Sequence, residues 1–484
     1  MTATYGCFID WDDSGTYAGS GEDVTTRVDA SRGVSMERGR DQIRALGKPM
    51  AGRLEFALLN TSRDYSTENT GSPRYAQLRP GHRVRVTADN GTPYTLATCL
   101  LDDIAQEPAL GVRSVRIPCL GMLSRLAGKR VTTGVYEGIT TDVAIGAILD
   151  AVGWPAGERA LGTGQTILQW WWLEEVDAFE ALRTLLNTEG PGAAIYERGD
   201  GYLVFENRHY RALTTRSTTS QGTFRDSGAG PWHREPFSLN PNLKGVINRA
   251  EIAVNVRAPQ PLDVIWELGS TLVLAASATI KLAIKAASDD PFRNAVAPVA
   301  GTDYTLLAGS ATLTLDRTSG RSATLTVAAG AGGATITALR LRAQALTATT
   351  VRVVNVTDTS ASQAKYGVRT WAEPVWPEID IYLAQELCNA IVQSYQEPRA
   401  TATITVEGAD ATMLGHCLSR EISDRVTVVE AQTGLNTAMY IEQIRHEIGV
   451  GNRHVTTLGL EKVVAGTLPG VWDSATWNTS VWGY

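Results

Sequence analysis

The feature of this sequence that most constrains its fold is a series of short runs in which apolar and polar residues alternate. In the run 52–60, Leu54, Phe56 and Leu58 fall on one face. Similar runs, separated by Gly, Pro, Asn and Asp, follow at 84–88, 94–100 and 112–117. A period of two is typical of β-strands with one buried face. The spacing of these strands predicts a barrel or a curled sheet near the start of the chain.

The same alternation returns near the other end of the chain. Strands are predicted at 246–256, 401–407, 425–430, 438–448 and 454–461. The chain is therefore expected to close, as it begins, with a β-domain.

Helical periodicity appears between these two groups of strands. Thr141 and Asp142 are expected to cap a helix with the apolar stripe Ile145, Ile148, Leu149 and Val152, which Gly153 ends. A second helix is predicted at about 176–187, with Phe179, Leu182, Leu185 and Leu186 facing inward. A hairpin over 193–206 should turn at Gly199-Asp200-Gly201. Two helices and a hairpin predict a small α/β domain.

A third helix is predicted after Asp380, which can cap it. Its apolar side would contain Ile381, Ala384, Leu387, Ile391, Val392 and Tyr395, and Glu397-Pro398 would end it.

The composition changes between about residues 258 and 357. This stretch is rich in Ala, Thr, Leu, Val and Gly, and its runs at 310–315, 322–327 and 334–341 alternate at period two. The glycine-rich segment 329–333 suits a hairpin turn. These features are typical of a β-sandwich inserted as a separate module.

The predicted fold class is mainly β with α/β parts (α+β), with two tube-type β-barrel domains, a small α/β domain and an inserted β-sandwich. The expected divisions are a first barrel at 1–112, the small α/β domain at 113–212, a connector with a strand of the second barrel at 213–257, the sandwich at 258–357, a helix and strands completing the second barrel and a second small domain at 358–468, and a Trp-rich tail at 469–484.

Charge is unevenly distributed along the chain. The net charge is −7, but residues 25–130 contain 17 Lys and Arg against 10 Asp and Glu, so the remainder carries −14. A basic first domain could face nucleic acid or an acidic partner, or its arginines could simply be scattered around a barrel rim. The absence of a basic run favours the scattered arrangement.

The cysteines and the N-terminus indicate where the protein is made. Five widely separated cysteines without a CxxC spacing predict buried thiols rather than a zinc site or disulfides: Cys7, Cys99, Cys119, Cys388 and Cys417. The N-terminus has neither the basic nor the apolar region of a signal peptide, and the most apolar stretch, 272–287, is too short to cross a bilayer. We therefore expect a soluble product that begins in the cytoplasm.

Histidines give no sign of an enzyme. The sequence contains His82, His209, His233, His416, His446 and His454, without an HExxH or HxH motif, and no Gly-x-Ser-x-Gly elbow occurs. His446 and His454 fall on neighbouring predicted strands and could face one another. Because a third ligand is missing, a pair of ordinary strand histidines is the favoured interpretation.

Carboxylates and tryptophans give only a weak signal for a sugar-cleaving site. Glu174 and Glu175 follow Trp170-Trp171-Trp172, and a second acidic pair is Asp102-Asp103. Consecutive tryptophans in a strand alternate sides, so at least one is expected in the core. Acids at 174–177 also suit a helix N-terminus. The segment Gly162-Thr-Gly-Gln lacks the lysine and spacing of a P-loop. No catalytic, cofactor-binding or metal-binding residue is predicted, and the expected product is not an enzyme.

Several segments together resemble the minor tail proteins of long-tailed bacteriophages that infect actinobacteria. They include 24–29, 33–41, 51–60, 72–81 and 83–86, then 141–155, 164–173 and 199–205, and near the end 422–428 and 440–446. The order and spacing of these segments, more than any one motif, carry the resemblance.

The resemblance implies a baseplate, or tail-tip, hub, with a hub fold like that of the N-terminal part of tail-associated lysins. In that family two barrel domains per subunit alternate around a ring, so that a homotrimer offers six similar barrels to a six-fold tail tube. The implied partners are the distal tail or tube ring, the tape measure protein, tail fibres or receptor-binding proteins, and phage DNA in passage; contact with the host cell surface is possible. The implied location is the virion tail tip, after assembly in the bacterial cytoplasm. No peptidase or lysozyme-like extension follows, so the cell-wall activity of some relatives is not carried over.

An axial channel that passes DNA should not grip it, because excess positive charge would bind phosphates. We therefore expect the arginines of the first domain to lie mostly at subunit interfaces rather than along the bore.

The segment 470–484 places Trp472, Trp477 and Trp482 five residues apart. Exposed tryptophans are unfavourable, so this segment is expected to form an interface with a neighbouring subunit or another tail protein, or to fold back on its own chain.

Three alternatives remain open. One is a tail adhesin in which the 258–357 module and the Trp170–Trp172 cluster contact host glycans. Another is a wall-degrading enzyme, and the third is a distal tail protein that forms hexamers.

Overall fold

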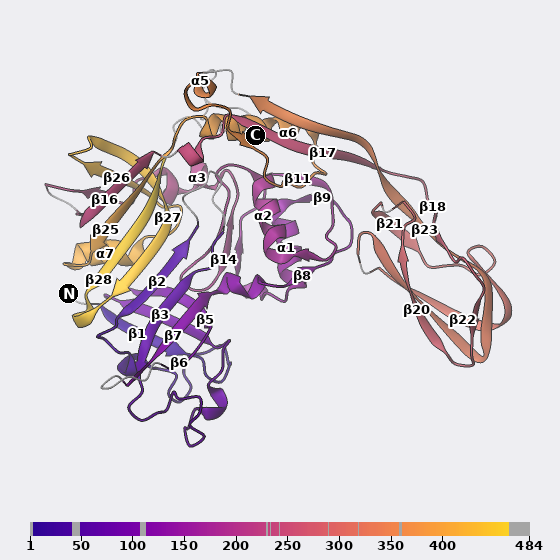
Figure 1. Cartoon of the computed structure of the whole chain (residues 1–484), viewed down its shortest axis with the longest axis horizontal. Helices are drawn as coiled ribbons and strands as arrows, with labels where there is room; N and C mark the ends of the chain where they lie inside the picture. Colours follow the sequence, from indigo (N-terminus) through magenta and orange to yellow (C-terminus); the bar gives the residue numbers. More distant parts are fainter. Residues whose placement is uncertain are drawn as a thin grey trace.

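The computed structural model describes residues 3–40, 49–106, 113–228, 231–232, 234–241, 243–288, 290–317, 319–357 and 361–463. Strands account for 47% and helices for 18% of the chain, and none of the several sheets formed by the described residues is closed. Figure 1 shows the main body, made of one large sheet and a helical layer, and a β-arm that projects from it. The predicted mainly-β α+β fold class is confirmed.

The N-terminal strands form one half of the large sheet. They are β1 (Thr4–Ile9), β2 (Val34–Gly39), β3 (Arg53–Leu59), β4 (Arg83–Asp89), β5 (Pro93–Leu101), β6 (Ala105–Gln106) and β7 (Ser114–Gly121). Their alternate residues are buried in one core, as the period of two predicted; Leu54, Phe56 and Leu58 are examples.

The C-terminal strands continue the same sheet. They are β25 (Ala400–Glu407), β26 (Arg425–Glu430), β27 (Leu435–Ile448) and β28 (His454–Lys462), with β15 (Thr223–Arg225) and β16 (Arg234–Pro241) at the margin. The strand order β1-β4-β5-β7-β3-β2-β27-β28-β25-β16 joins the two halves through β2 and β27, so the segment expected to be mostly connector supplies two strands. Helix α7 (Ala411–Ser419) packs against both halves, with Leu414 in one core and Met413 in the other.

The expected closure of two barrels is replaced by one open sheet of 13 strands. The reason lies in β2, which pairs with β3 on one side and with β27 on the other. A strand hydrogen-bonded along both edges has no edge left for closing the N-terminal sheet on itself.

The small α/β part contains two helices and short strands. Its strands are β8 (Arg130–Val131), β9 (Tyr136–Thr140), β10 (Arg159–Leu161), β11 (Ile167–Trp171), β12 (Val176–Asp177), β13 (Ala194–Glu197) and β14 (Leu203–Glu206). Its helices are α1 (Thr141–Ala151) and α2 (Ala178–Glu189), followed by the single turns α3 (Tyr210–Leu213) and α4 (Thr215–Thr218). The predicted stripe residues Ile145, Ile148 and Leu149 are buried, as are Leu182, Leu185 and Leu186.

The helix ends differ in detail from the prediction. Helix α1 already includes Thr141, and its N-cap Thr140 makes no side-chain capping bond, so the predicted cap by Thr141 and Asp142 is wrong. The Asp142 carboxylate instead accepts the Gly164 N–H at 2.9 Å. Gly153 adopts the left-handed conformation that ends the helix, as predicted.

The arm is built on one long hairpin-like ribbon. Strand β17 (Arg249–Pro259) pairs with the end of β23 (Ser322–Thr357), and β18 (Asp263–Glu267), β19 (Leu272–Leu274), β20 (Thr279–Lys285), β21 (Phe292–Val296) and β22 (Tyr304–Asp316) all pair with β23. The expected sandwich is therefore formed by one sheet that folds over along β23 around its own core.

The predicted hairpin turn at 329–333 is wrong, because β23 runs through this segment. The glycines serve a different purpose. Gly309 and Gly333 both have positive φ, at the point where the β22–β23 register shifts, so they bend the paired strands instead of reversing them.

The remaining helices cover the base of the arm. Helix α5 (Ser362–Tyr366) and strand β24 (Thr370–Trp371) precede α6 (Ile381–Tyr395), which packs on β17 and β23. The Asp380 carboxylate accepts the Tyr382 N–H at 2.7 Å, which confirms the predicted cap. One core includes α1, α2, α6 and β17, so the base of the arm shares the hydrophobic interior of the α/β part.

Candidate functional surface and the joint beneath it

The large sheet has one apolar and one polar face across the seam between its halves. The apolar face includes Met36 on β2 and Ile444 on β27. The opposite face has polar or charged residues on each strand; they are Arg116 on β7, Arg53 and Glu55 on β3, Ser35 and Glu37 on β2, Gln443, Arg445 and Glu447 on β27, Thr457 on β28, and Thr403 and Thr405 on β25. We call this set the polar sheet face.

Charges of opposite sign stand beside one another on this face. Glu37 lies directly opposite both Arg53 and Arg445 in the neighbouring strands. Arg116 pairs with Glu55 at 3.5 Å, and Arg445 with Glu447 at 2.7 Å. The cross-strand pairs stabilise register at modest energy, the Arg445–Glu447 pair lies within β27, and together these residues are three arginines and three glutamates. A hollow of about 370 Å³, lined in part by Arg32 and Ser35, lies on this face.

Beneath the sheet, a buried ion network ties distant parts of the chain together. The carboxylate of Glu442 on β27 binds the guanidinium of Arg40 and that of Arg211, which donates at 2.7 Å. Burial acts to raise the pKa of Glu442, but the positive charges of Arg211 and Arg40 outweigh it and hold that pKa at about 2. All three side chains are nearly inaccessible, so the charges stabilise the joint only while they remain together.

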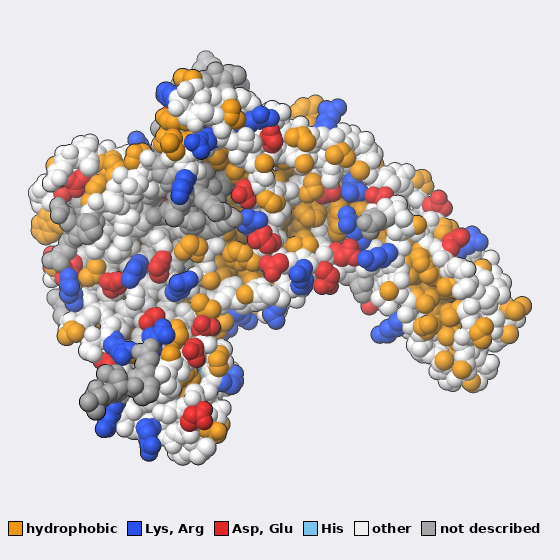
Figure 2. Space-filling model, in the orientation of Figure 1, with side chains coloured by type: hydrophobic (Ala, Val, Ile, Leu, Met, Phe, Trp, Pro, Cys, Tyr) orange, Lys and Arg blue, Asp and Glu red, His pale blue; other side chains and the backbone are white. Residues whose placement is uncertain are grey.

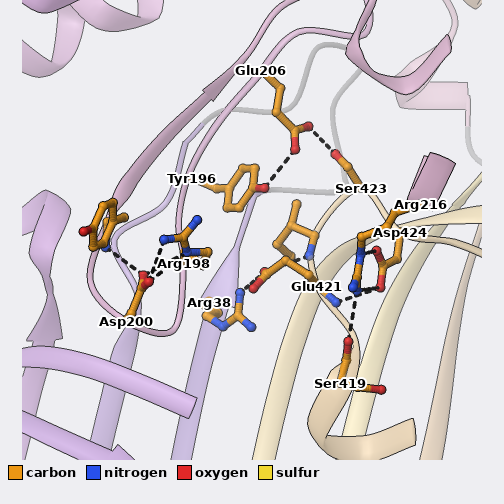
Figure 3. A network of polar contacts seen from close by, with 12 residues as sticks. Arg38, Tyr196, Arg198, Asp200, Glu206, Arg216, Ser419, Glu421, Ser423 and Asp424 are labelled. Carbon is orange, nitrogen blue, oxygen red and sulfur yellow. Dashed lines mark hydrogen bonds and ion pairs between the residues drawn. The ribbon is translucent and has the colours of Figure 1, made fainter. Parts of the chain in front are cut away.

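A second buried carboxyl, Glu206 on β14, connects the α/β hairpin to the C-terminal strands. The Tyr196 hydroxyl donates to it at 2.8 Å and the Ser423 hydroxyl at 2.5 Å (Figure 3). Burial raises the pKa of Glu206 to about 7, against the lowering effects of Arg211 and these hydroxyls. Glu197 on β13 is buried in the same way, accepting the Gly52 and Leu123 N–H groups, and burial raises its pKa to about 7.

An open cleft of about 630 Å³ lies at this joint, between β2, the β13–β14 hairpin and the segment after α7. Figure 3 shows the charged residues that surround it in opposite pairs, Arg38 with Glu421 and Arg216 with Asp424. Each arginine thus already has an acid within the chain. Arg38, Arg40 and Arg83 of the basic first segment all pair with acids outside it, so part of the charge imbalance along the sequence is neutralised within the fold.

The two strand histidines meet, as their positions predicted. His446 Nδ1 and His454 Nε2 are 3.0 Å apart, and the Tyr5 hydroxyl lies 2.8 Å from His454 Nδ1. Burial lowers the pKa of His454 to about 4, and burial together with the neighbouring ring lowers that of His446 well below its usual value. Both rings are therefore neutral at pH 7. The chain of contacts Tyr5–His454–His446 continues to the Thr456 hydroxyl, 3.1 Å from His446 Nδ1.

The three consecutive tryptophans are buried where the arm meets the body. Trp170 and Trp172 pack with Leu346 of β23, and Trp171 lies in the core of the α/β part. Arg293 covers the Trp170 ring, and Arg257 and Arg321 lie over Trp172. The expectation that at least one tryptophan is core is confirmed. Because these rings are covered, they offer no face on which a sugar could stack.

The other sequence candidates lie apart. Glu175 is exposed, and its N–H donates to the Thr132 hydroxyl oxygen. The five cysteines are buried free thiols, as predicted. His233 and the interface candidates Trp472, Trp477 and Trp482 lie outside the described residues.

Among the described residues, one group of carboxylates could hold a metal ion and was missed in the sequence. Asp10, Asp12 and Glu22 each place an oxygen within 4.8 Å of the others. The Asp10 carboxylate accepts hydrogen bonds from the Ser14 and Gly15 N–H groups, so part of its hydrogen-bonding capacity is already used within the loop. The local spacing Asp-x-Asp-x-Ser-Gly is the signal that could have found the group. The ion network at Glu442 had no such local signal.

No helix in the described part of the chain combines the length and the apolar character needed to cross a membrane.

No family model and no curated protein matches the sequence. Solved structures are similar in fold. A tail protein from Neisseria meningitidis MC58 aligns with a TM-score of 0.52 at 11% identity, over 96% of this chain and 97% of that one. A prophage tail protein from Shewanella oneidensis gives 0.48 at 13% identity, over 95% and 98%. A prophage tail protein from Listeria monocytogenes EGD-e gives 0.44 at 10%, over 94% of each chain. The chain therefore has a fold similar to that of the meningococcal tail protein over nearly its whole length.

Proposed function

We propose that this chain is a structural protein of a bacteriophage tail tip, a homotrimeric baseplate hub that closes the tail tube and joins it to distal fibre or host-contact proteins. The carrying observation is the seam between β2 and β27, which makes one continuous sheet from strands at the two ends of the chain. Two sets of strands per subunit, repeated three times, can meet a six-fold tube. The likeness in fold to a tail protein supports the same role.

We assign the polar sheet face to the wall of the channel through which DNA passes. Its strand residues carry three arginines against three glutamates, and Arg32 at the hollow on this face adds one further positive charge, so the face offers little excess positive charge to phosphates. A hydrated face of this kind lets DNA slide without being held. The exposed first-domain arginines outside this face, but not Arg38, Arg40 and Arg83, which pair within the chain, remain assigned to contacts between subunits or with the tube ring.

Measuring the mass of the purified oligomer tests the assembly. A mass three times that of the chain is expected, and imaging should show two sheet halves per subunit around a threefold axis. A hexamer would favour the alternative distal tail protein, and a monomer at micromolar concentration would contradict the hub.

Reversing the glutamates of the polar sheet face tests the channel. Lysines in place of Glu37, Glu55 and Glu447 would raise the net charge of this wall by six units per subunit, because each change removes one negative charge and adds one positive charge. We expect the wild-type oligomer not to retain duplex DNA at 0.15 M salt, and the triple variant to bind it with a steep salt dependence. Fluorescence anisotropy with a labelled duplex measures both.

The matched control places three lysines elsewhere, at the exposed acids Glu267, Asp316 and Glu386. If the control binds DNA as tightly as the sheet variant, overall charge and not the channel wall explains the result.

The proposal gives the chain no reaction to catalyse. Zymography on bacterial cell walls, with Glu174→Ala and Glu175→Ala for comparison, would contradict this if the wild-type protein cleared the wall and the variants did not.

The glycan-binding alternative now depends on the arm alone, where hydrophobic side chains gather in Figure 2. Binding of the whole protein to a glycan array would favour this alternative.

A further inference from the structure

The turn between α7 and β26, residues 420–424, is held in a conformation that its sequence does not favour. Ser423 has a φ of 68°, in the left-handed region that residues other than glycine rarely adopt. Its N–H donates to Ile441 O at 2.8 Å, and its carbonyl accepts the Ser217 hydroxyl at 2.8 Å. A backbone in this region persists only where surrounding contacts hold it. The contacts of Ser423 therefore decide whether the turn stays closed.

Glu206, at the end of β14, joins this turn to the β13–β14 hairpin. Its carboxyl group lies between the hydroxyl groups of Tyr196 and Ser423 (Figure 3). Glu206 and Ser423 are each 1% exposed, and both line the open cleft of about 630 Å³ at the joint. Water reaches this contact through the cleft once the turn moves away from the hairpin.

The partners of Glu206 suit a neutral carboxyl group. A hydroxyl can donate to a carboxylate or accept from a protonated carboxyl, so the Tyr196 and Ser423 hydroxyls serve either state. No described cationic side chain forms an ion pair with Glu206. Arg211 instead directs two nitrogens to Glu442, at 2.7 and 3.1 Å, and donates from Nε to the Ser423 hydroxyl. Burial without a bound counter-ion favours the protonated form.

The titratable and charged groups packed around Glu206 and its hydroxyl partners come from several elements. They are Tyr196 on β13, Tyr210 and Arg211 on α3, Arg40 after β2, Glu421 in the turn, and Glu442 on β27. Burial raises the pKa of Glu206 to about 7, against the smaller lowering effects of Arg211, the two hydroxyls and Arg40. In an open turn the carboxyl is hydrated and has its ordinary pKa of 4.5. The closed form therefore binds the proton more tightly than the open form.

We propose that the protonation of Glu206 controls how tightly residues 420–424 close over the β13–β14 hairpin. The neutral carboxyl holds the turn closed, and ionisation favours an open form in which the carboxylate is hydrated and the cleft is wider. Closure is tightest below pH 4.5 and weakens as the pH rises to 7. Burial also raises the pKa of Asp424 in the same turn, so Asp424 acts in the same direction. This pH response does not depend on the proposed tail-tip function.

Hydrogen exchange of the Ser423 amide between pH 5 and 7 tests the response in the full chain. The ratio of the intrinsic to the observed exchange rate should fall at least about tenfold over this range, because a difference of one pKa unit corresponds to a tenfold change in the opening equilibrium. Amides of β4, which lies away from this joint, should change less than about threefold. A constant ratio at Ser423 in the wild-type protein would overturn the proposal without any variant.

Replacing Glu206 by Gln assigns the response to this residue. The amide of Glu206→Gln mimics the neutral carboxyl at every pH, because it can accept from one hydroxyl and donate to the other. We expect its exchange ratio at Ser423 to change less than about threefold between pH 5 and 7, and to stay near the wild-type value at pH 5. An equal response in this variant and the wild type would overturn the assignment to Glu206.

The matched control is Glu197→Gln, which changes another buried carboxyl of the same hairpin. Glu197 accepts the Gly52 and Leu123 N–H groups and does not contact the turn at 420–424. This variant should keep the wild-type response at Ser423. Loss of the response in Glu197→Gln would mean that the hairpin as a whole, and not the Glu206 contact, responds to pH.

Discussion

Buried charge is the residue-scale feature on which the joint depends. Glu442 stays ionised because Arg40 and Arg211 surround it, and each of the three would be costly if left alone. Arg40 directly follows β2, Arg211 lies on α3 and Glu442 on β27, so the network holds together parts of the chain that local structure does not connect.

Replacing Glu442 by Gln should lower the free energy of unfolding by about 3–5 kcal/mol, because two buried guanidinium groups lose their counter-charge. Urea denaturation at pH 7 measures the loss. The control is Glu447→Gln, which breaks a half-exposed pair with Arg445 and should cost less than about 1 kcal/mol. Equal losses would show that the buried network contributes no more than a surface pair.

The histidine pair should make stability sensitive to acid. The pKa of His454 in the folded protein is about 4, below its ordinary 6.5. Its contribution to the free energy of unfolding is therefore fully present above pH 6.5 and is lost as the pH falls toward 4. The loss is on the order of 3 kcal/mol. His454→Gln cannot take up this proton, so its free energy of unfolding should fall less than that of the wild type between pH 7 and 4. Parallel curves for both proteins would contradict this.

At the scale of elements, glycines decide whether a strand turns or bends. Gly333 has a φ of 79° and an added Cβ would lie 2.8 Å from Leu274 O, whereas an added Cβ on Gly332 meets nothing within 4 Å. The neighbouring positions therefore differ in both conformation and space, although they look alike in the sequence.

We expect Gly333→Ala to destabilise the arm by about 1–3 kcal/mol, from the left-handed backbone and the close carbonyl. Gly332→Ala should change stability by less than about 0.5 kcal/mol. Thermal unfolding followed by far-ultraviolet circular dichroism would compare them. A larger loss in Gly332→Ala would mean that the strand does not bend at Gly333.

At the scale of the whole molecule, the arm packs against the body through the buried rings of Trp170 and Trp172. Leu346, Arg293 and Arg321 cover Trp170 and Trp172, and the arm leaves the body along the β17–β23 ribbon. The arm thus has an orientation set by side-chain packing as well as by its two covalent links.

Arg257 and Ala348 are partners in the ribbon, so a two-residue Asn-Gly turn can replace residues 258–347. We expect the shortened protein to fold and keep its oligomeric mass, while its tryptophan emission shifts to longer wavelength as Trp170 and Trp172 become exposed. A changed mass would show that the arm takes part in the contact between subunits.

The sequence by itself determined the elements whose signals are local. Period-two alternation placed β3, β25 and β28, helical periodicity with Asp380 placed α6, and neighbouring strands brought His446 into contact with His454. These features depend on residues a few positions apart, so backbone preference and amphipathic pattern are sufficient to specify them.

Only the tertiary structure decided what those elements do together. Three features depend on distant partners, up to about 400 residues away. They are the pairing of β2 with β27 in an open sheet, the contact of Glu442 with Arg40 and Arg211, and the passage of β23 through 329–333. A strand edge, a charged group and a glycine each have several possible partners in the sequence. Hydrogen bonding, desolvation and packing in the folded chain select one of them.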